Sequence, residues 1–315
     1  MMVKLDKTDS LFCLCTTCQT CIEQCVMRTT EPGSLHVRTR AKEIIERRAS
    51  GEFSHLIDKY WYVPRHEGTD QRAFEIIPDG SFDLIFILGE TFCRLLFLGP
   101  FTRKVFLPIR NSHEYFCIRF HPGRVPQLAT CIRSAELVNN GIYLSELLGI
   151  ETCFLCEHLY VLANFDSKQQ FIENIFRKVG LESTVPRNRF QRLAEHVLSF
   201  QGQIRVDELA SDSGMSCRTL ERLFKDEVGI PPKAFIRMIR LQKAVEKLRM
   251  GSYGRLTDIA YDSGYTDQSH FIKDFKQLFG DLPSSATPLS SVAFLQFEAS
   301  DPGHFMAHTA PTESH

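Results

Sequence analysis

The chain has no apolar run that approaches the ~18 residues needed to cross a membrane as a helix. Its first residues also lack a basic segment followed by an apolar stretch and small residues, which is the pattern of a secretory signal. We therefore expect a cytoplasmic protein with no membrane partner.

The chain also has almost no net charge, −1 over 315 residues. The charge is unevenly placed, because residues 186–286 contain 16 Lys and Arg against 13 Asp and Glu, a net +3. This mild tilt is compatible with nucleic-acid binding but does not indicate it by itself.

An internal repeat dominates the C-terminal half. A small residue, a glycine and two large apolar residues recur in the same order, 50 residues apart up to the glycine and 51 beyond it. The matched pairs are Ala210 and Ala260, Gly214 and Gly264, Leu220 and Phe271, and Phe224 and Phe275. The repeat predicts two copies of one structural unit, at Val206–Lys225 and Leu256–Phe279.

Each copy has the pattern of a helix-turn-helix. The apolar residues before Gly214 have helical spacing, and the glycine provides the backbone freedom that a tight turn needs. Ser216 is placed to cap the second helix of the first copy, and Thr266 or Asp267 that of the second.

The second helix of each copy presents a polar outward face. In the first copy, charged residues recur at i, i+3, i+4 and i+7, which is one side of a helix. A face that both donates and accepts hydrogen bonds suits the reading of base edges. The predicted DNA-contacting residues are Arg218, Glu221, Arg222, Lys225, Gln268, Ser269, His270 and Lys273. The alternative is that both are ordinary solvated helices of an α-helical bundle.

Segments in both copies, and a short segment after the first copy, resemble those of a known family. They are Ser216–Lys225, Gly229–Pro232, Asp262–Phe271 and Pro283. With these runs, residues 186–286 resemble the DNA-binding domain of the AraC/XylS family of bacterial transcription regulators. The resemblance implies that Pro232–Met250 is a stiff spacer and that the recognition helices enter major-groove segments about 34 Å apart. Because Thr287-Pro288 follows soon after, we expect the last helix of the family pattern to be short.

Residues 52–125 have the pattern of short strands separated by turn signals. The expected strands are His55–Val63, Arg72–Ile77, Phe82–Leu88, Thr91–Leu98, Phe101–Leu107 and His113–Phe120. Such strands predict a small antiparallel barrel. With Tyr60-Trp61, Pro78-Asp79-Gly80, Gly99-Pro100 and Phe120–Gly123, the segment resembles the cupin-like sensing domain of one branch of the AraC family.

Enzymatic cupins bind a metal through an H-x-H pair and a downstream acid, and this chain contains no H-x-H. We therefore expect no metal, no cofactor, no catalytic residue and no enzymatic activity. A barrel of this size can instead enclose one small ligand. The candidate effector-binding residues are Trp61, Phe82, Phe86 and Arg119. The alternative is that these are ordinary core or surface residues.

The N-terminal 50 residues contain a cluster of five cysteines, Cys13, Cys15, Cys18, Cys21 and Cys25. Thiolates this close could hold zinc or an iron–sulfur cluster, or act as a redox sensor, but no metal-site pattern is matched cleanly. The alternative is a disordered leader, or residues upstream of a true start at Met27. The charged segment Arg38–Arg48 is expected to be helical.

Residues 126–179 carry apolar residues at helical spacing, most clearly at Cys153–Leu162 and Lys168–Val179. In the regulators that the chain resembles, helices after the barrel mediate dimerisation, so the resemblance implies a homodimer. Cys153 and Cys156 lie within an apolar helical stretch and are interpreted as packed thiols.

The sequence thus predicts an α+β protein, with a small cupin-like antiparallel barrel and helices followed by an all-α domain of two helix-turn-helix units. The expected division is a Cys-rich, disordered leader (1–50), a sensing and dimerisation domain (51–180), a linker (181–187), an AraC-type DNA-binding domain (188–287) and a disordered tail (288–315).

The predicted function is sequence-specific transcription regulation on double-stranded promoter DNA, controlled at the N-terminal domain by a small effector or a partner. A small-molecule effector and RNA polymerase are the further candidate partners. The alternatives are a redox- or metal-responsive regulator that uses Cys13–Cys25, and an Ada-like enzyme fused to a DNA-binding domain.

Overall fold

The computed structural model describes residues 26–27, 37–38, 44–66, 72–90, 93–124, 132–144, 150–180, 188–250, 255–284 and 294–295. The cysteines of Cys13–Cys25, the expected linker at 181–187 and nearly all residues after 284 lie outside the described residues. Among the helices described, none is long and apolar enough to cross a membrane.

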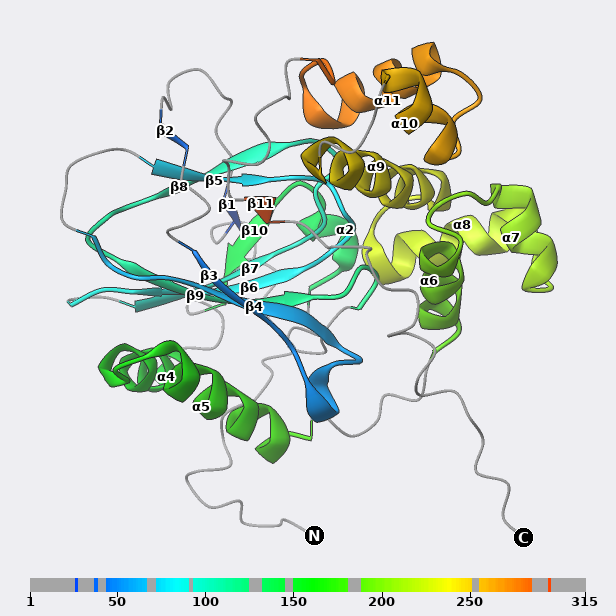
Figure 1. The fold of residues 1–315 in the computed structure, drawn as a ribbon. Helices are drawn as coiled ribbons and strands as arrows, with labels where there is room; N and C mark the ends of the chain where they lie inside the picture. The colour runs from blue at the N-terminus through cyan, green and yellow to red at the C-terminus, as the bar shows by residue number, and fades with distance from the viewer. Residues whose placement is uncertain are drawn as a thin grey trace, which may run out of the picture.

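The N-terminal region is built on a seven-stranded sheet that is antiparallel throughout (Figure 1). Its strands, in spatial order, are β1 (Val26–Met27), β10 (Gly141–Tyr143), β7 (Cys93–Leu98), β6 (Asp83–Leu88), β9 (Glu114–Phe120), β4 (Ile57–Val63) and β3 (Ile45–Arg48). A single 3-10 turn, η2 (Gly51–Phe53), joins β3 to β4. The central strands read as nearly continuous apolar runs because the sheet is covered on both faces.

A second, smaller sheet is centred on β5 (Arg72–Ile76). One edge of β5 pairs antiparallel with β8 (Val105–Ile109), and the other pairs parallel with the short β2 (Val37–Arg38) and β11 (Phe294–Leu295). The two sheets enclose an apolar cluster that includes Trp61. Five of the six predicted strands are confirmed with shifts of at most two residues at their ends, whereas the strand expected at Phe101–Leu107 is β8 at Val105–Ile109. Closure of the two sheets into a cupin-like barrel stays a prediction.

The expectation of a helix over Arg38–Arg48 is wrong. Ile45–Arg48 forms β3, which pairs with β4 through partners such as Arg47 with Tyr60. All four side chains of β3 are exposed, so the strand is held by backbone pairing to a buried neighbour rather than by its own apolar content. That pairing cannot be read from local charge spacing.

Two helices, α4 (Ile150–Val161) and α5 (Phe165–Lys178), cover the face of the large sheet that points away from the small sheet (Figure 1). They confirm the helices expected at 153–162 and 168–179. A disulfide joins Cys93 in β7 to Cys156 in α4, with 5.7 Å between the Cα atoms. The interpretation of Cys156 as a packed thiol is therefore wrong, because its partner lies 63 residues away in the sequence.

The C-terminal region consists of α6 (Arg189–Ser199), α7 (Val206–Asp212), α8 (Cys217–Val228), α9 (Pro232–Met250), α10 (Leu256–Asp262) and α11 (Gln268–Phe279). The predicted spacer Pro232–Met250 is confirmed at both ends. The fold class is α+β, with an antiparallel sheet followed by helices.

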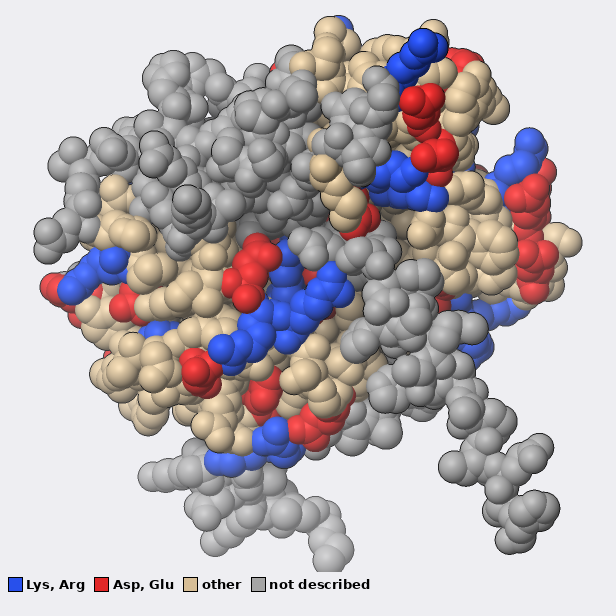
Figure 2. Space-filling view, viewed as in Figure 1, with Lys and Arg blue, Asp and Glu red and all other residues tan. Residues whose placement is uncertain are grey.

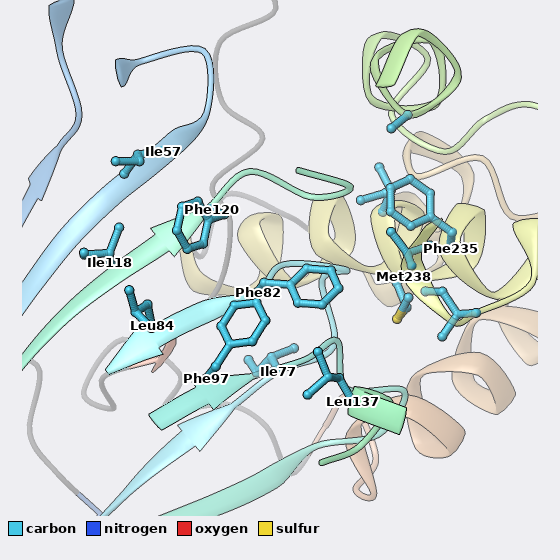
Figure 3. Close-up of a cluster of buried hydrophobic side chains, with 14 of the residues drawn as sticks. Ile57, Ile77, Phe82, Leu84, Phe97, Ile118, Phe120, Leu137, Phe235 and Met238 are labelled. Atoms are coloured by element: carbon cyan, nitrogen blue, oxygen red, sulfur yellow. The ribbon is translucent and has the colours of Figure 1, made fainter. Parts of the chain in front are cut away.

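The two regions share one apolar core. A single buried cluster extends from the outer face of the large sheet to the interior of the helical region. Figure 3 shows Phe82, Phe97 and Leu137 on the sheet side and Phe235 and Met238 on α9, which faces them. The C-terminal helices therefore pack against the N-terminal region.

Candidate nucleic-acid interface

The helix α8 is the second helix of the first repeat. Its N-terminus is capped by Ser216, whose Oγ accepts from the backbone N–H of Thr219 at 3.2 Å. Its inward residues Leu220 and Phe224 are fully buried. The helix ends at Gly229, which has φ +77°. The cap and the inward face agree with the prediction from the sequence.

The helix α11 repeats this design. Asp267 is its cap, since Oδ1 accepts from the backbone N–H of His270 at 2.7 Å. Phe271 and Phe275 are fully buried, as their counterparts are in α8. Gly280 ends the helix with φ +83°. Of the two caps left open by the sequence, Asp267 is the one formed.

The turns inside the two units also match. Gly214 has φ +64° and Gly264 has φ +80°, a backbone region that disfavours side chains. After each glycine, the next N–H donates at 2.9 Å to the equivalent alanine carbonyl, Ala210 in one unit and Ala260 in the other. The repeat in the sequence is thus a repeat in structure.

The outward face of α8 is open. Arg218, Glu221, Arg222 and Lys225 are all exposed. Within the described part of the chain, none of these four side chains makes a hydrogen bond or an ion pair. Three cations and one carboxylate on one helical face can contact phosphates and base edges without first breaking an internal contact.

The outward face of α11 is partly engaged. Ser269 and Lys273 are exposed, but Gln268 is half-buried and its Oε1 accepts from the Thr257 hydroxyl at 2.9 Å. The ring of His270 packs edge-on against Tyr265, with 5.3 Å between the ring centroids. The sequence did not indicate these contacts, because they depend on the turn and on α10.

The spacer α9 fixes the second unit by ion pairs. Arg237 donates through Nε and Nη2 to the two carboxylate oxygens of Asp274 in α11, at 3.1 and 2.8 Å. Lys247 pairs with Asp262 at the end of α10, at 2.5 Å. The Asp274 pair is mostly buried, whereas Asp262 is exposed and Lys247 partly exposed, so the Asp274 pair is the stronger constraint.

Charge on this domain is mixed. Figure 2 shows basic and acidic side chains side by side over the helical region, in keeping with its small net charge. Groups of three or more His, Cys, Asp or Glu that could hold a metal are absent from the described residues. The chemistry on offer is hydrogen bonding and ion pairing by side chains on two equivalent helices.

The four candidate effector residues of the N-terminal region are all buried, at 0 or 1% exposure. Trp61 lies in the cluster between the two sheets, whereas Phe82 and Phe86 belong to the cluster on the other face. Arg119 forms two hydrogen bonds to Asp83, at 3.0 and 2.9 Å. The structure does not bring the four into one group, and their contact with an effector stays a prediction.

Contacts between the two regions were missed in the sequence. Gln242 of α9 donates to the backbone oxygen of Pro78 at 2.7 Å. The Lys104 ammonium pairs with Asp281, just beyond α11, at 2.6 Å. The contact of Gln242 could have been suspected, because it is a polar residue at an inward position of the predicted spacer. The residues around Lys104 contain no pattern that predicts its ion pair.

Two family models match the chain. A helix-turn-helix domain matches residues 209–287, and a domain of unknown function (DUF6597) matches residues 46–142. These correspond to the two helix-turn-helix units and to the β-rich N-terminal region.

The chain is similar to several transcriptional activators. It is 36% identical over 125 residues to the HTH-type transcriptional activator RhaS of Escherichia coli O139:H28, which covers 40% of this chain and 41% of RhaS. It is 28% identical over 142 residues to the virulence regulon transcriptional activator VirF of Yersinia enterocolitica, which covers 45% of this chain and 50% of VirF. The chain thus spans half or less of these curated relatives.

Among solved structures, ToxT of Vibrio cholerae is 13% identical, with 78% of this chain and 97% of ToxT covered. The TM-score is 0.40, which is too low to establish a shared fold. RhaS and VirF are transcriptional activators, in agreement with the prediction of a non-enzymatic protein. The repeated units, their matched family model and these relatives agree that the C-terminal region is a helix-turn-helix domain like that of these transcriptional activators, and a β-rich domain precedes it.

Proposed function

We propose that the protein is a sequence-specific transcription regulator whose two helix-turn-helix units read successive major-groove segments of promoter DNA. The observation that carries this proposal is that α8 and α11 both begin at a side-chain cap, bury equivalent apolar positions and leave a polar face outward. The names of the relatives favour activation, with RNA polymerase as the partner in that step.

The residues proposed to contact DNA are Arg218, Glu221, Arg222, Lys225, Gln268, Ser269, His270 and Lys273. Arginine to guanine, glutamine to adenine and glutamate to cytosine are the expected base pairings. The open face of α8 supports a direct role, whereas Gln268 would have to release Thr257 to reach a base.

The N-terminal region is proposed to sense a small effector and to form a homodimer, in a cytoplasmic protein. Its boundaries differ from the predicted division, because β1, β2 and β3 from the expected leader and β11 from the expected tail belong to its sheets. Phe154 and Val161 of α4 support the dimer, since these apolar side chains are 60 and 75% exposed. Exposed apolar side chains on an outer helix are the kind of surface that a second copy covers.

Selection of binding sites from random DNA tests the proposal. Wild type should select one motif with two parts about one helical turn apart. Arg222→Ala should relax one part and Lys273→Ala the other, whereas Lys178→Ala, an exposed change on α5, should relax neither. A motif that survives both changes intact would contradict two-unit reading, and the absence of any selected motif would contradict sequence-specific binding.

A further inference from the structure

A small charged cavity lies at the edge of the large sheet, beside β3 and the start of β4. Its volume is about 90 Å³, and its lining residues are Glu46, Arg47, Arg48, Asp58 and Lys59. Figure 2 shows basic and acidic side chains gathered over this part of the sheet. This space is large enough for the polar head of a small ligand.

Most of the lining charges already have partners. The Lys59 ammonium pairs with Glu46 at 2.9 Å. Arg47 pairs with Asp166 of α5. Asp58 differs, because it is 6% exposed and its Oδ2 is a buried oxygen without a hydrogen-bond partner among the described residues. A buried carboxylate oxygen in that state costs free energy that a bound donor would recover.

The surrounding charges favour a cationic donor. The Arg119 guanidinium lies beside three carboxylates, and two of them, Asp83 at 2.9 Å and Asp79 at 3.3 Å, already form ion pairs with it. Asp58 is the third. With Arg48 and the Lys59–Glu46 pair included, the group has four carboxyl groups and three cations, and Asp58 is the carboxyl whose Oδ2 has no hydrogen-bond partner among the described residues. A ligand with one positive charge would balance the group.

We propose that this cavity is the effector site and that it takes a small ligand with a primary ammonium group, which donates to Asp58. The inference rests on the proposed function, in which the N-terminal region senses an effector. Amino acids and small diamines both carry that group. An amino acid also carries a carboxylate, whereas a diamine does not.

The site is coupled to the DNA-binding domain through a short path. Asp79 and Asp83 hold Arg119 from either side of the turn that follows β5. The carbonyl before Asp79, that of Pro78, accepts from Gln242 of α9. A Cβ on Gly80 of this turn would lie 2.8 Å from the Phe235 ring of α9, so the turn and the helix are in close contact. A ligand that pairs with Asp58 changes the charge around Arg119, and α9 is the spacer between the two reading units.

Calorimetric titration of the full chain tests the ligand class. The probes are the twenty common amino acids and 1,4-diaminobutane, with propionate as a control that lacks the ammonium group. We expect an ammonium compound to bind, propionate not to bind, and Asp58→Asn to weaken binding at least tenfold. Binding of amino acids alone assigns an amino-acid effector, and binding of the diamine alone assigns an amine. Failure of every ammonium compound, or equal binding of propionate, would overturn the proposal.

The matched control is Glu90→Gln, an exposed carboxylate in the turn between β6 and β7 that is paired with Arg65. It should leave ligand affinity unchanged. Asp58→Asn should keep a melting temperature close to that of wild type, because it preserves the shape of the side chain. If Asp58→Asn does not fold, the pH dependence of ligand affinity in wild type tests the pairing with Asp58 instead.

Burial raises the pKa of Asp58 to about 7, opposed by Lys59 on β4, Arg119 on β9 and Arg48 on β3 and reinforced by Asp79 in the turn. An ammonium group binds the ionised carboxylate, so affinity should fall about tenfold for each pH unit below 7 and level off above it. Affinity that stays flat from pH 5 to 8 would contradict pairing with Asp58.

Coupling is measured as the ratio of DNA affinities with and without the bound ligand. Wild type should show at least a fivefold change, within the usual range for linked sites. Gln242→Ala should keep ligand binding and lose most of that change. Wild type that binds the ligand but shows no DNA binding contradicts the proposed function, whereas DNA binding without ligand binding contradicts only this inference.

Discussion

The two helix-turn-helix units have the same frame and different outer faces. Both begin their second helix at a side-chain cap and end it at a glycine with positive φ. On α8 the four outward side chains make no hydrogen bond or ion pair within the described residues. On α11 Gln268 is bonded to Thr257 and His270 packs on Tyr265. The first unit is therefore better suited to base readout, and the second to holding a fixed position.

The two helix-turn-helix units also differ in their contacts with the rest of the molecule. The first unit meets the N-terminal region at the end of α8, where the Ser134 hydroxyl of the short α2 (Ser134–Leu137) donates to the Glu227 carbonyl at 2.7 Å. The second is held by Lys104, whose backbone N–H donates to the Leu278 carbonyl at 2.7 Å, and by the Arg237–Asp274 pair. The second unit thus has more fixed charge contacts than the first.

The largest expected effect comes from removing the anchor of α11. Asp274→Ala leaves Arg237 without its carboxylate, and breaking a largely buried pair costs about 3 kcal/mol in the free energy of unfolding. Asp262→Ala removes the exposed pair with Lys247 and should cost at most about 1 kcal/mol. Urea unfolding of the full chain measures both. Equal losses would show that the second unit is not held as the contacts indicate.

Arg222→Ala tests the open face of α8. It should cost about 1–3 kcal/mol at the cognate site and relax the preference at one or two base pairs. Lys273→Ala on α11 should cost less, since that face is partly engaged in internal contacts. Binding titrations on cognate and single-substituted DNA measure both losses. A larger loss for Lys273→Ala would reverse the assigned roles of the two units.

A valine in place of the turn glycine should destabilise the two units to different extents, and this difference should be smaller than the effects above. Valine at Gly214 or Gly264 is strained by the positive φ in both units, at about 1–2 kcal/mol. A Cβ at Gly214 meets nothing within 4 Å, but at Gly264 it lies 2.6 Å from Cγ of Gln203, which bonds to the Asp262 carbonyl. Gly264→Val should therefore lower the free energy of unfolding by about 1 kcal/mol more than Gly214→Val. Thermal unfolding of the two variants side by side gives the difference.

The repeated units were predictable because their signals are local. Ser216 and Asp267 lie next to the helices they cap, and Gly214 and Gly264 are in the turns they permit. These signals place the ends of the helices before any tertiary contact is known.

The missed features all depend on distant partners. β3 is a strand because β4 pairs with it, and Cys156 is oxidised because Cys93 lies against α4. Asp58 is a candidate ligand-binding group because Arg119, which lies on another strand, is already paired with two other carboxylates. Hydrophobic alternation places such residues on a strand but does not identify what stands beside them.

The smallest expected effect distinguishes residues of the α8 face that contact phosphates from those that contact bases. Lys225 is in the last turn of α8, one turn beyond Arg222 and away from the capped N-terminus that enters the groove in this motif. We expect its ammonium to contact a phosphate, so Lys225→Ala should weaken cognate and random DNA by the same factor. The slope of log affinity against log salt should fall by about one, because one fewer counterion is released. Titrations at several salt concentrations on both DNAs measure this, with Lys178→Ala as the control for a change in net charge away from the interface. An unchanged slope together with a relaxed motif would make Lys225 a base-reading residue and extend the reading face of the first unit by a full helical turn.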